Sequence, residues 1–299
     1  MREAAHRWGT DPDVRRALRH GALIGAWTGT VLFAAYAVAF YTRPGHWFIG
    51  ADAHAYWMTG QRAQIYGSAP GHKDAFLYSP LFEQLIHPLT LLPWPIFCTT
   101  FVVLNGVAIL WLVKPLPLRW AGPACLLAVP AMLSGDVNCL IGCAIVIGMS
   151  RPAAWGLPLL TKIAPAGPGL LWLVTRREWK QLIRAAAVIG PLVALSVAVE
   201  PGAWHDWMSL LLTHGQSAGW GRAAREVAAL VVAFWAARRN VVWLIPIACW
   251  LANPMDFLHP NALVILAAVP RLVEYRRRTE PQHRDKPRPE VGSMASYTT

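Results

Sequence analysis

The chain has 299 residues, of which 55% are hydrophobic and only 14% are charged, and this balance excludes an ordinary soluble protein. The formal net charge of +11 does not indicate nucleic-acid binding, because the basic residues gather in short connections and in the C-terminal tail rather than on one helix face. Cytoplasmic loops of membrane proteins collect Lys and Arg, so the excess reflects topology. We therefore expect a membrane protein that binds no nucleic acid.

The first predicted element is a transmembrane helix over Gly21 to Phe40, a run of 20 residues without a charge. At ~1.5 Å per residue, such a helix crosses a hydrocarbon core about 30 Å thick. A secretory signal peptide fits less well, because the run is too long and no small-residue cleavage site follows it. The arginines between Arg2 and Arg19 place residues 1–20 in the cytoplasm by the positive-inside rule.

The loop that follows, residues 42–79, is then predicted to lie at the outer face as the catalytic loop. It contains Asp52, with Tyr56 one helical turn later, so both would share one face of a helix formed there. A carboxylate at the mouth of a membrane cavity can act as a general base, since desolvation raises its pKa toward neutrality. The alternative is an N-cap or a solvated loop aspartate.

The rest of the chain predicts a series of short apolar helices. Ser79 to Trp94 is interrupted by charge and proline, which favours a helix at the outer interface or one that dips partway into the membrane. The other segments are Cys98–Val113, Trp120–Ser134, Val137–Ser150, Ala153–Ile163, Ala164–Thr175, Leu182–Val199, Val227–Ala237, Val241–Leu251 and Pro260–Val273. Several are too short to cross alone, and backbone can end at membrane depth only beside protein or a water-filled cavity. We expect an all-α transmembrane bundle of about ten membrane segments, several short or re-entrant, around an outward-facing cavity.

The connections between these segments alternate in charge. The basic set contains Lys114 and Arg119, Arg151, Arg176 to Lys180, Arg238 and Arg239, and Arg276 to Arg278. The other set contains Asp136 and Asn138, the corner at Lys162, Glu200 to Asp206, and Asn253 to Pro260, and it shares the outer face with Asp52; Arg222 and Arg225 are exceptions. The pattern predicts a multi-pass protein of the cytoplasmic membrane with both termini in the cytoplasm. Residues 21–273 would form one domain and residues 274–299 a disordered cytoplasmic tail.

Lys162 and His259 stand out in this topology. Lys162 is flanked by apolar residues and prolines, and a charge at that depth normally marks a substrate or a partner, of which a phosphate is the natural one. Snorkelling of its stem is the alternative. His259 at the outer end of the last segment could transfer a proton or donate to phosphate, or it could be structural. Asp136 and Asn138 could bind substrate or only cap a hairpin corner.

Other chemistries find little support in the sequence. The five cysteines all fall in apolar segments, which suits packing rather than disulfides or a zinc site. The glycine patterns of nucleotide-binding loops and a defensible glycosidase carboxylate pair are both absent from the sequence. We expect no metal and no cofactor.

Four stretches occur together in a familiar order. These are GADAHAYW, FLYSPLFEQLIHPLTLLP, the SGDVN corner, and TKIAP followed by a basic loop, with FLHP as a late match. Over about Asp52 to Lys180 the chain resembles the polyprenol-phosphate-mannose-dependent α-mannosyltransferase family of the GT-C class. In two departures, Ser79 replaces the first proline of Tyr-Pro-Pro, and Asp136 replaces the usual glutamine.

The resemblance implies a GT-C membrane enzyme that moves a sugar from a polyprenyl-phosphate carrier to a glycolipid or polysaccharide acceptor outside the cytoplasmic membrane, with inversion. It implies that Asp52 deprotonates the acceptor, that Lys162 stabilises the departing phosphate, and that His259 assists either step. Tyr56, Tyr78, Asn138 and Asp136 would bind or position the substrates. The donor sugar, by the same resemblance, is mannose.

Two other functions remain open at this stage. A transporter would use broken helices and intramembrane charge, but should show two halves with matching broken helices, which the sequence lacks. An inactive scaffold that binds lipid-linked sugar or a partner subunit is the other alternative.

Overall fold

The computed structural model describes residues 12–43, 48–215, 219–255 and 259–279. These residues form helices and no strands, which confirms the all-α class. The α-helices are α2 (Pro12–Thr42), α3 (Ala51–Trp57), α4 (Pro80–Thr90), α5 (Trp94–Val113), α6 (Leu118–Leu127), α7 (Val129–Ser134), α8 (Asn138–Gly148), α9 (Gly156–Thr161), α10 (Ala166–Thr175), α11 (Trp179–Val199), α12 (Pro201–Gly215), α13 (Trp220–Arg239), α14 (Ile245–Leu251), α15 (Pro260–Leu263) and α16 (Val269–Thr279). Short 3₁₀ turns connect several of them.

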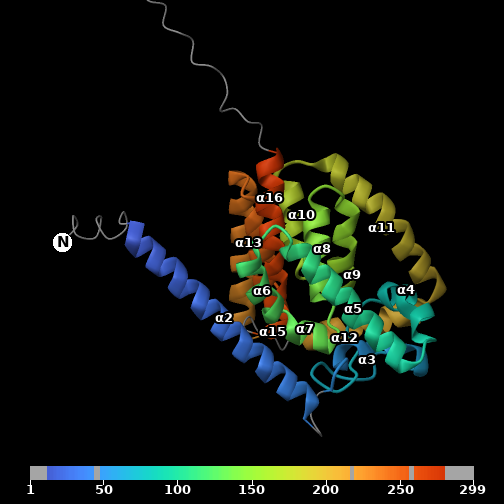
Figure 1. Cartoon of the computed structure of the whole chain (residues 1–299). Coiled ribbons are helices and arrows are strands. Elements are labelled where there is room, and N and C mark those ends of the chain that lie inside the picture. Colours follow the sequence, from blue (N-terminus) through green and yellow to red (C-terminus); the bar gives the residue numbers. More distant parts are fainter. Residues whose placement is uncertain (1–11, 44–47, 216–218, 256–258, 280–299) are drawn as a thin grey trace, which may run out of the picture.

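The helices α8, α10, α13, α14 and α16 stand side by side as a bundle, while α2 and α11 slant along its outside (Figure 1). One end of the bundle carries α3, α4, α7, α12 and α15, together with the C-terminal end of α2. We call this end the site end. The helix α16 ends at the opposite end (Figure 1). Residues 274–279 of the predicted tail are part of this helix, and the rest of the tail, residues 280–299, lies outside the described residues.

Within the described residues, three helices are long and apolar enough to cross a membrane, namely α2, α5 and α11. Shorter apolar helices lie over Asn138–Gly148, Ala166–Thr175 and Val242–Leu251. These helices fit a multi-pass membrane protein. Some short pieces join end to end, since α15, a 3₁₀ turn and α16 together cover residues 260–279, or about 30 Å of helix. The total of about ten segments stays a prediction.

The helices of the bundle meet through small side chains. On α13, which contacts α10 and α14, the buried residues are Ala229, Ala233, Ala236 and Ala237. Such a row at helical spacing lets backbones approach closely, which is how helices associate where lipid removes the hydrophobic driving force. This close contact gives the site end a rigid support.

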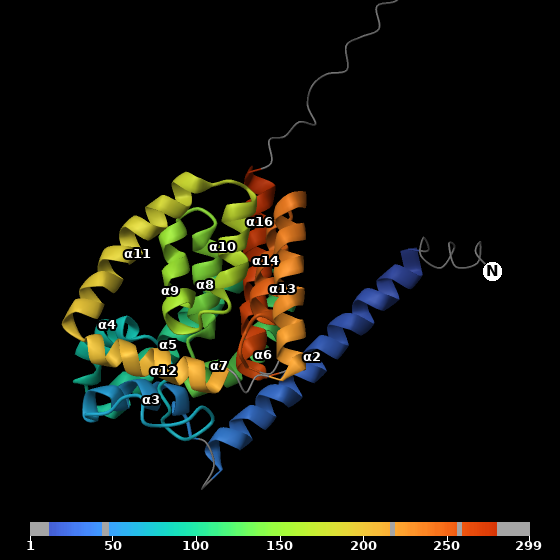
Figure 2. The same ribbon diagram turned by 180° about the vertical axis from the view of Figure 1, so that it is seen from behind.

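The sequence predicted one helix of the site end, α4, but not another, α12. The helix α4 forms within the expected Ser79–Trp94 segment and contacts α3 and α12. The helix α12 was expected only as a connection, yet it runs across the site end beneath the bundle (Figure 2). Trp207 of α12 is buried and its indole N–H donates to the backbone oxygen of Leu77 at 3.2 Å. The predicted outer loop is therefore held from two sides.

Candidate active site

Asp52 lies in the first turn of α3, a short helix held against the corner between α7 and α8. The N–H of Gly50 donates to the backbone oxygen of Leu133 at 2.6 Å, which fixes the start of α3. The corner residue Gly135 has a φ of 73°, and a Cβ on it would lie 2.6 Å from the Cβ of Ala53. A side chain at this position would therefore push α3 away, together with Asp52.

Asp52 is connected to the rest of the site through Asn261 of α15. The amide nitrogen of Asn261 donates to Oδ2 of Asp52 at 3.3 Å and to the hydroxyl of Ser134 at 3.0 Å. Tyr41, next to the end of α2, also interacts with Ser134 and Asn261. The helices α2, α7 and α15 thus meet α3 near the Asp52 carboxylate.

Asp136 and Lys162 form a buried ion pair beside Asp52. The Lys162 ammonium donates to both Asp136 oxygens, at 2.9 Å and 3.2 Å, and the two side chains are only 8% and 2% exposed. Lys162 follows α9, where Pro165 precedes the next helix, so the chain turns there and places the ammonium inside the protein. The arrangement excludes snorkelling of the Lys162 stem to the surface.

Asn138 connects Asp136 of this ion pair with Asn253 and Asn261. Its backbone N–H donates to Oδ1 of Asp136 at 2.6 Å, and its side-chain amide donates to the backbone oxygen of Asn261 at 2.8 Å. The amide of Asn253 donates in turn to Oδ1 of Asn138 at 3.3 Å. Asn138 is fully buried, so these bonds satisfy a side chain that would otherwise be costly to bury.

Tyr56 and Tyr78 form a second pair, one turn along α3 from Asp52. Their hydroxyls lie 3.0 Å apart, and both rings are buried against Phe82. Burial and the charges of Asp136 and Asp52 raise the pKa of both phenols well above the usual value, so both hydroxyls stay neutral hydrogen-bonding groups.

The electrostatic surroundings of Asp52 suit a proton acceptor. Burial, with a further contribution from the negative charge of Asp136, raises the pKa of its carboxyl to about 7, although Lys162 and the hydroxyl of Ser134 act in the opposite direction. A carboxylate in this range accepts a proton more readily than an exposed aspartate, and a substantial share of it is ionised near neutral pH. The pKa of Asp52 therefore lies near neutral pH, where a general base works best.

His259 directly precedes α15 and stands two residues before Asn261. It is the N-cap of α15, and its Nδ1 accepts a hydrogen bond from the backbone N–H of Asn261 at 3.3 Å. The residue two positions later is the one that donates to Asp52, so the cap sets the place of Asn261.

Every site residue expected from the sequence is thus near the same end, but the connecting residues were not anticipated. Ser134, Asn253 and Asn261 are all buried polar residues that join the named ones. Their signal was available, because an asparagine at the end of an apolar segment needs a partner when buried. Ser79, the departure from Tyr-Pro-Pro, has a local reason: its hydroxyl accepts from the N–H of Phe82 and caps α4.

The arrangement can accept a proton at Asp52 and hold an anion near Lys162. In the described part of the chain, no three His, Cys, Asp or Glu side chains gather in a way that could hold a metal ion. Asp52 offers acid–base chemistry at this site, and the Lys162 ammonium offers electrostatic stabilisation.

Comparison with known proteins gives a family. The sequence model of glycosyltransferase family 87 matches residues 76–285, more than half of the chain, including Tyr78, Asp136, Asn138, Lys162 and His259 but beginning after Asp52. Searches of curated proteins and of solved structures found no match. The chain therefore belongs to glycosyltransferase family 87, a GT-C family of membrane transferases that depend on polyprenyl-phosphate-mannose.

Proposed function

We propose that the protein transfers mannose from a polyprenyl-phosphate carrier to a glycolipid or polysaccharide hydroxyl on the outer face of the cytoplasmic membrane. Family membership supports a lipid-linked sugar as donor. The charge of the connections supports the outer location: the site end carries Asp52 and Asp136, whereas Arg238, Arg239 and Arg276 to Arg278 end helices that run away from it, with Arg222 and Arg225 as exceptions. Both termini would then be cytoplasmic.

In the proposed reaction, the acceptor hydroxyl attacks the anomeric carbon of the mannose from the face opposite the phosphate. Asp52 takes the hydroxyl proton as the new C–O bond forms. The bond between the anomeric carbon and the phosphate oxygen breaks, and its electron pair leaves with the polyprenyl phosphate. Attack from the opposite face inverts the configuration at the anomeric carbon.

Lys162 stabilises the negative charge that develops on the departing phosphate, because a buried ammonium acts strongly in a site with little water. Asp136 holds Lys162 in place and also raises the pKa of Asp52, so one carboxylate serves both partners. Asn138 fixes the corner, and the hydroxyls of Tyr56 and Tyr78 offer neutral contacts to sugar or phosphate oxygens.

His259 has a positioning role in this proposal. Its contact with the N–H of Asn261 fixes the residue that donates to Asp52, so it acts on the base through Asn261. The observation that carries the whole proposal is the convergence of Asp52 with the Lys162–Asp136 pair at one end of the bundle, joined through Asn261 and Ser134.

The test is transfer of radiolabelled mannose from synthetic polyprenyl-phosphate-mannose to membrane glycolipids by purified protein. We expect Asp52→Asn to lower the transfer rate by about 10²- to 10⁴-fold with unchanged thermal unfolding, the usual size for loss of a general base. Asp206→Asn is the matched control, because Asp206 is also an aspartate near the site end but is largely exposed on α12.

Equal transfer by wild type and Asp52→Asn would reject Asp52 as the base and keep the enzyme. Binding of the labelled donor by a folded wild-type protein without transfer to any acceptor fraction would instead support a scaffold that binds lipid-linked sugar.

A further inference from the structure

A strongly basic pocket lies far from the candidate active site, between the start of α2 and the start of α6. Its volume is about 430 Å³, and it is lined by Pro12, Arg15, Arg16, Arg19, His20, Leu23, Arg119 and Trp120. Among these eight described residues none is acidic. The reaction proposed above uses none of them.

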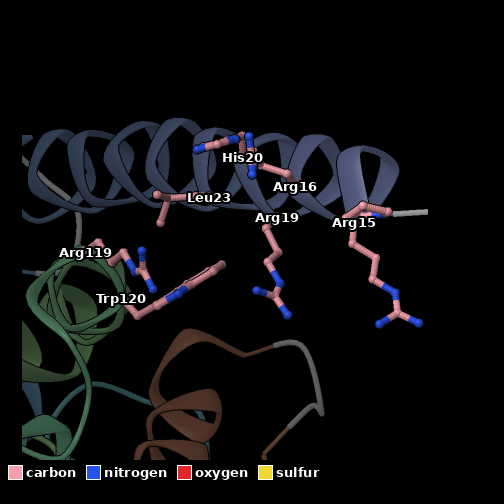
Figure 3. A pocket seen from close by; sticks show the side chains of 8 residues that line it. Arg15, Arg16, Arg19, His20, Leu23, Arg119 and Trp120 are labelled. Atoms are coloured by element: carbon pink, nitrogen blue, oxygen red, sulfur yellow. The ribbon is translucent and has the colours of Figure 1, made fainter. Parts of the chain in front are cut away.

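The side chains are arranged so that two helices face one space. Arg15, Arg19 and Leu23 follow one another at intervals of four residues, so they lie along one face of α2. In Figure 3, Arg15 and Arg19 extend from α2 toward the side on which Arg119 and Trp120 of α6 lie. Cationic heads thus stand next to an indole ring and a leucine, which is the mixed character of a membrane interface.

The pocket is built by a tight contact between α2 and α6. The indole N–H of Trp27 donates to the backbone oxygen of Arg119 at 3.0 Å. A Cβ on Gly122 would lie 2.3 Å from the Trp27 ring, so only glycine lets the two helices meet this closely. The basic groups of the two helices are therefore held together without any ligand to attract them.

The position along α2 separates the pocket from the active site. Tyr41 interacts with Ser134 and Asn261 at the candidate active site, and Arg19 precedes it by 22 residues of continuous helix, or about 33 Å. Because α2 slants along the outside of the bundle, this is a distance along the helix and not a depth (Figure 1). The charge of the connections, which assigns Arg19 and Arg119 to the cytoplasmic set, places the pocket at the interface opposite the proposed outer site.

We propose that this pocket binds the phosphate headgroup of an anionic glycerophospholipid in the leaflet opposite the active site. The guanidinium groups bind the phosphate, Arg being suited to bidentate contacts with it, and Leu23 and Trp120 contact the glycerol and upper acyl region. A polyprenyl-phosphate donor carries the same phosphate, but its phosphate must be beside Asp52 for transfer, and Arg19 lies about 33 Å along α2 from Tyr41 at that site. The occupant is therefore a bulk lipid rather than the donor.

The test is native mass spectrometry of the full chain in detergent micelles. The added lipids are phosphatidylglycerol, phosphatidylcholine with the same acyl chains, and a polyprenyl phosphate, each at equal concentration. We expect wild type to retain phosphatidylglycerol in preference to phosphatidylcholine, and Arg19→Gln/Arg119→Gln to lose about tenfold or more of this binding, since each basic group near a lipid phosphate contributes measurably.

The control is Arg239→Gln/Arg277→Gln, which removes the same charge from exposed arginines outside the pocket. This variant should bind phosphatidylglycerol as wild type does. Equal loss in both double variants would show a general charge effect and overturn the proposal, as would unchanged binding by the pocket variant. Stronger retention of polyprenyl phosphate than of phosphatidylglycerol, lost in the pocket variant, would also overturn it in favour of the carrier lipid. Thermal unfolding of both variants confirms that each is folded.

Discussion

The ion pair of the candidate active site is buried, whereas the charged side chains of the basic pocket are exposed and all of one sign. At the site, Asp136 and Lys162 are buried, paired, and surrounded by hydrogen-bonded asparagines. In the pocket, Arg16, Arg19 and Arg119 are exposed and gathered with no acidic side chain among the described lining residues. Both regions lie beside apolar helices, so the membrane alone does not explain the contrast.

This difference in burial and pairing predicts how each region responds to substitution. A buried ion pair with fixed partners tolerates little change, because removing one partner leaves a charge where water cannot solvate it. An exposed group of like charges depends instead on an anion from outside, and single changes there alter binding more than folding. Substitutions at the two regions should therefore produce effects of very different size.

The largest effect is expected for Lys162→Met. This change leaves Asp136 buried without its partner and should cost about 3–5 kcal/mol of stability, as well as abolishing transfer. The measurement is thermal unfolding in detergent together with the mannose transfer assay. Arg239→Met, which removes an exposed arginine, should change stability by less than about 0.5 kcal/mol.

Adding Asp136→Leu to Lys162→Met separates the effect on stability from the effect on transfer. In Asp136→Leu/Lys162→Met an apolar pair replaces the ion pair, so stability should return toward wild type while transfer stays lost. If the double variant recovered transfer as well, the ion pair would be structural only. If Lys162→Met alone unfolded no more easily than Arg239→Met, the contrast between the two regions would be wrong.

The next effect is expected for Asn261→Ala, which removes the donor to Asp52 and to Ser134. Transfer should fall roughly tenfold, the scale of one hydrogen bond to a charged group. The pH at half-maximal kcat/KM should also rise, because that bond favours the ionised carboxylate. A fall in rate with an unchanged pH profile would assign Asn261 a purely structural role.

The sequence predicted the fold class and several site residues, but not the residues that connect them. The apolar runs and the alternating basic connections predicted a helical membrane protein, because lipid allows few backbone arrangements and those leave a strong pattern. The same pattern placed Asp52, Lys162 and His259 at one end. Asn261 was missed, because its importance comes from a contact with Asp52 across 209 positions of the chain, which no local pattern records.

The helix α12 was missed for a different reason. Its sequence from Pro201 to Gly215 mixes tryptophans with His205 and Asp206, which suits a helix lying across an end of the bundle and gives no long apolar run. Its contact through Trp207 with the backbone of Leu77 supplies the stabilisation that local propensity does not. The resemblance, in turn, supplied mannose and the carrier, which no geometry of side chains specifies.

A smaller effect is expected on the pH dependence of Asp136→Asn. In wild type the rate should fall as pH drops through about 7, since a protonated Asp52 cannot accept a proton. Removing the charge of Asp136 removes one cause of the raised pKa and leaves Lys162 free to favour the carboxylate. Both changes lower the pKa of Asp52, so the acid limb of the kcat/KM profile should move to lower pH by about one unit. Movement to higher pH would contradict the arrangement of charges described here.

The smallest effect is expected for His259→Asn, which tests whether this histidine transfers protons or only caps α15. Asparagine is also a good N-cap, so it can still accept from the N–H of Asn261 and keep that residue beside Asp52. Transfer by His259→Asn should therefore stay within about threefold of wild type with the same pH profile, whereas His259→Ala should lose about 1 kcal/mol of stability with the cap. If both variants instead lost transfer equally and the acid limb changed shape in each, His259 would exchange protons directly with a substrate, and the reaction would need two titrating groups rather than one.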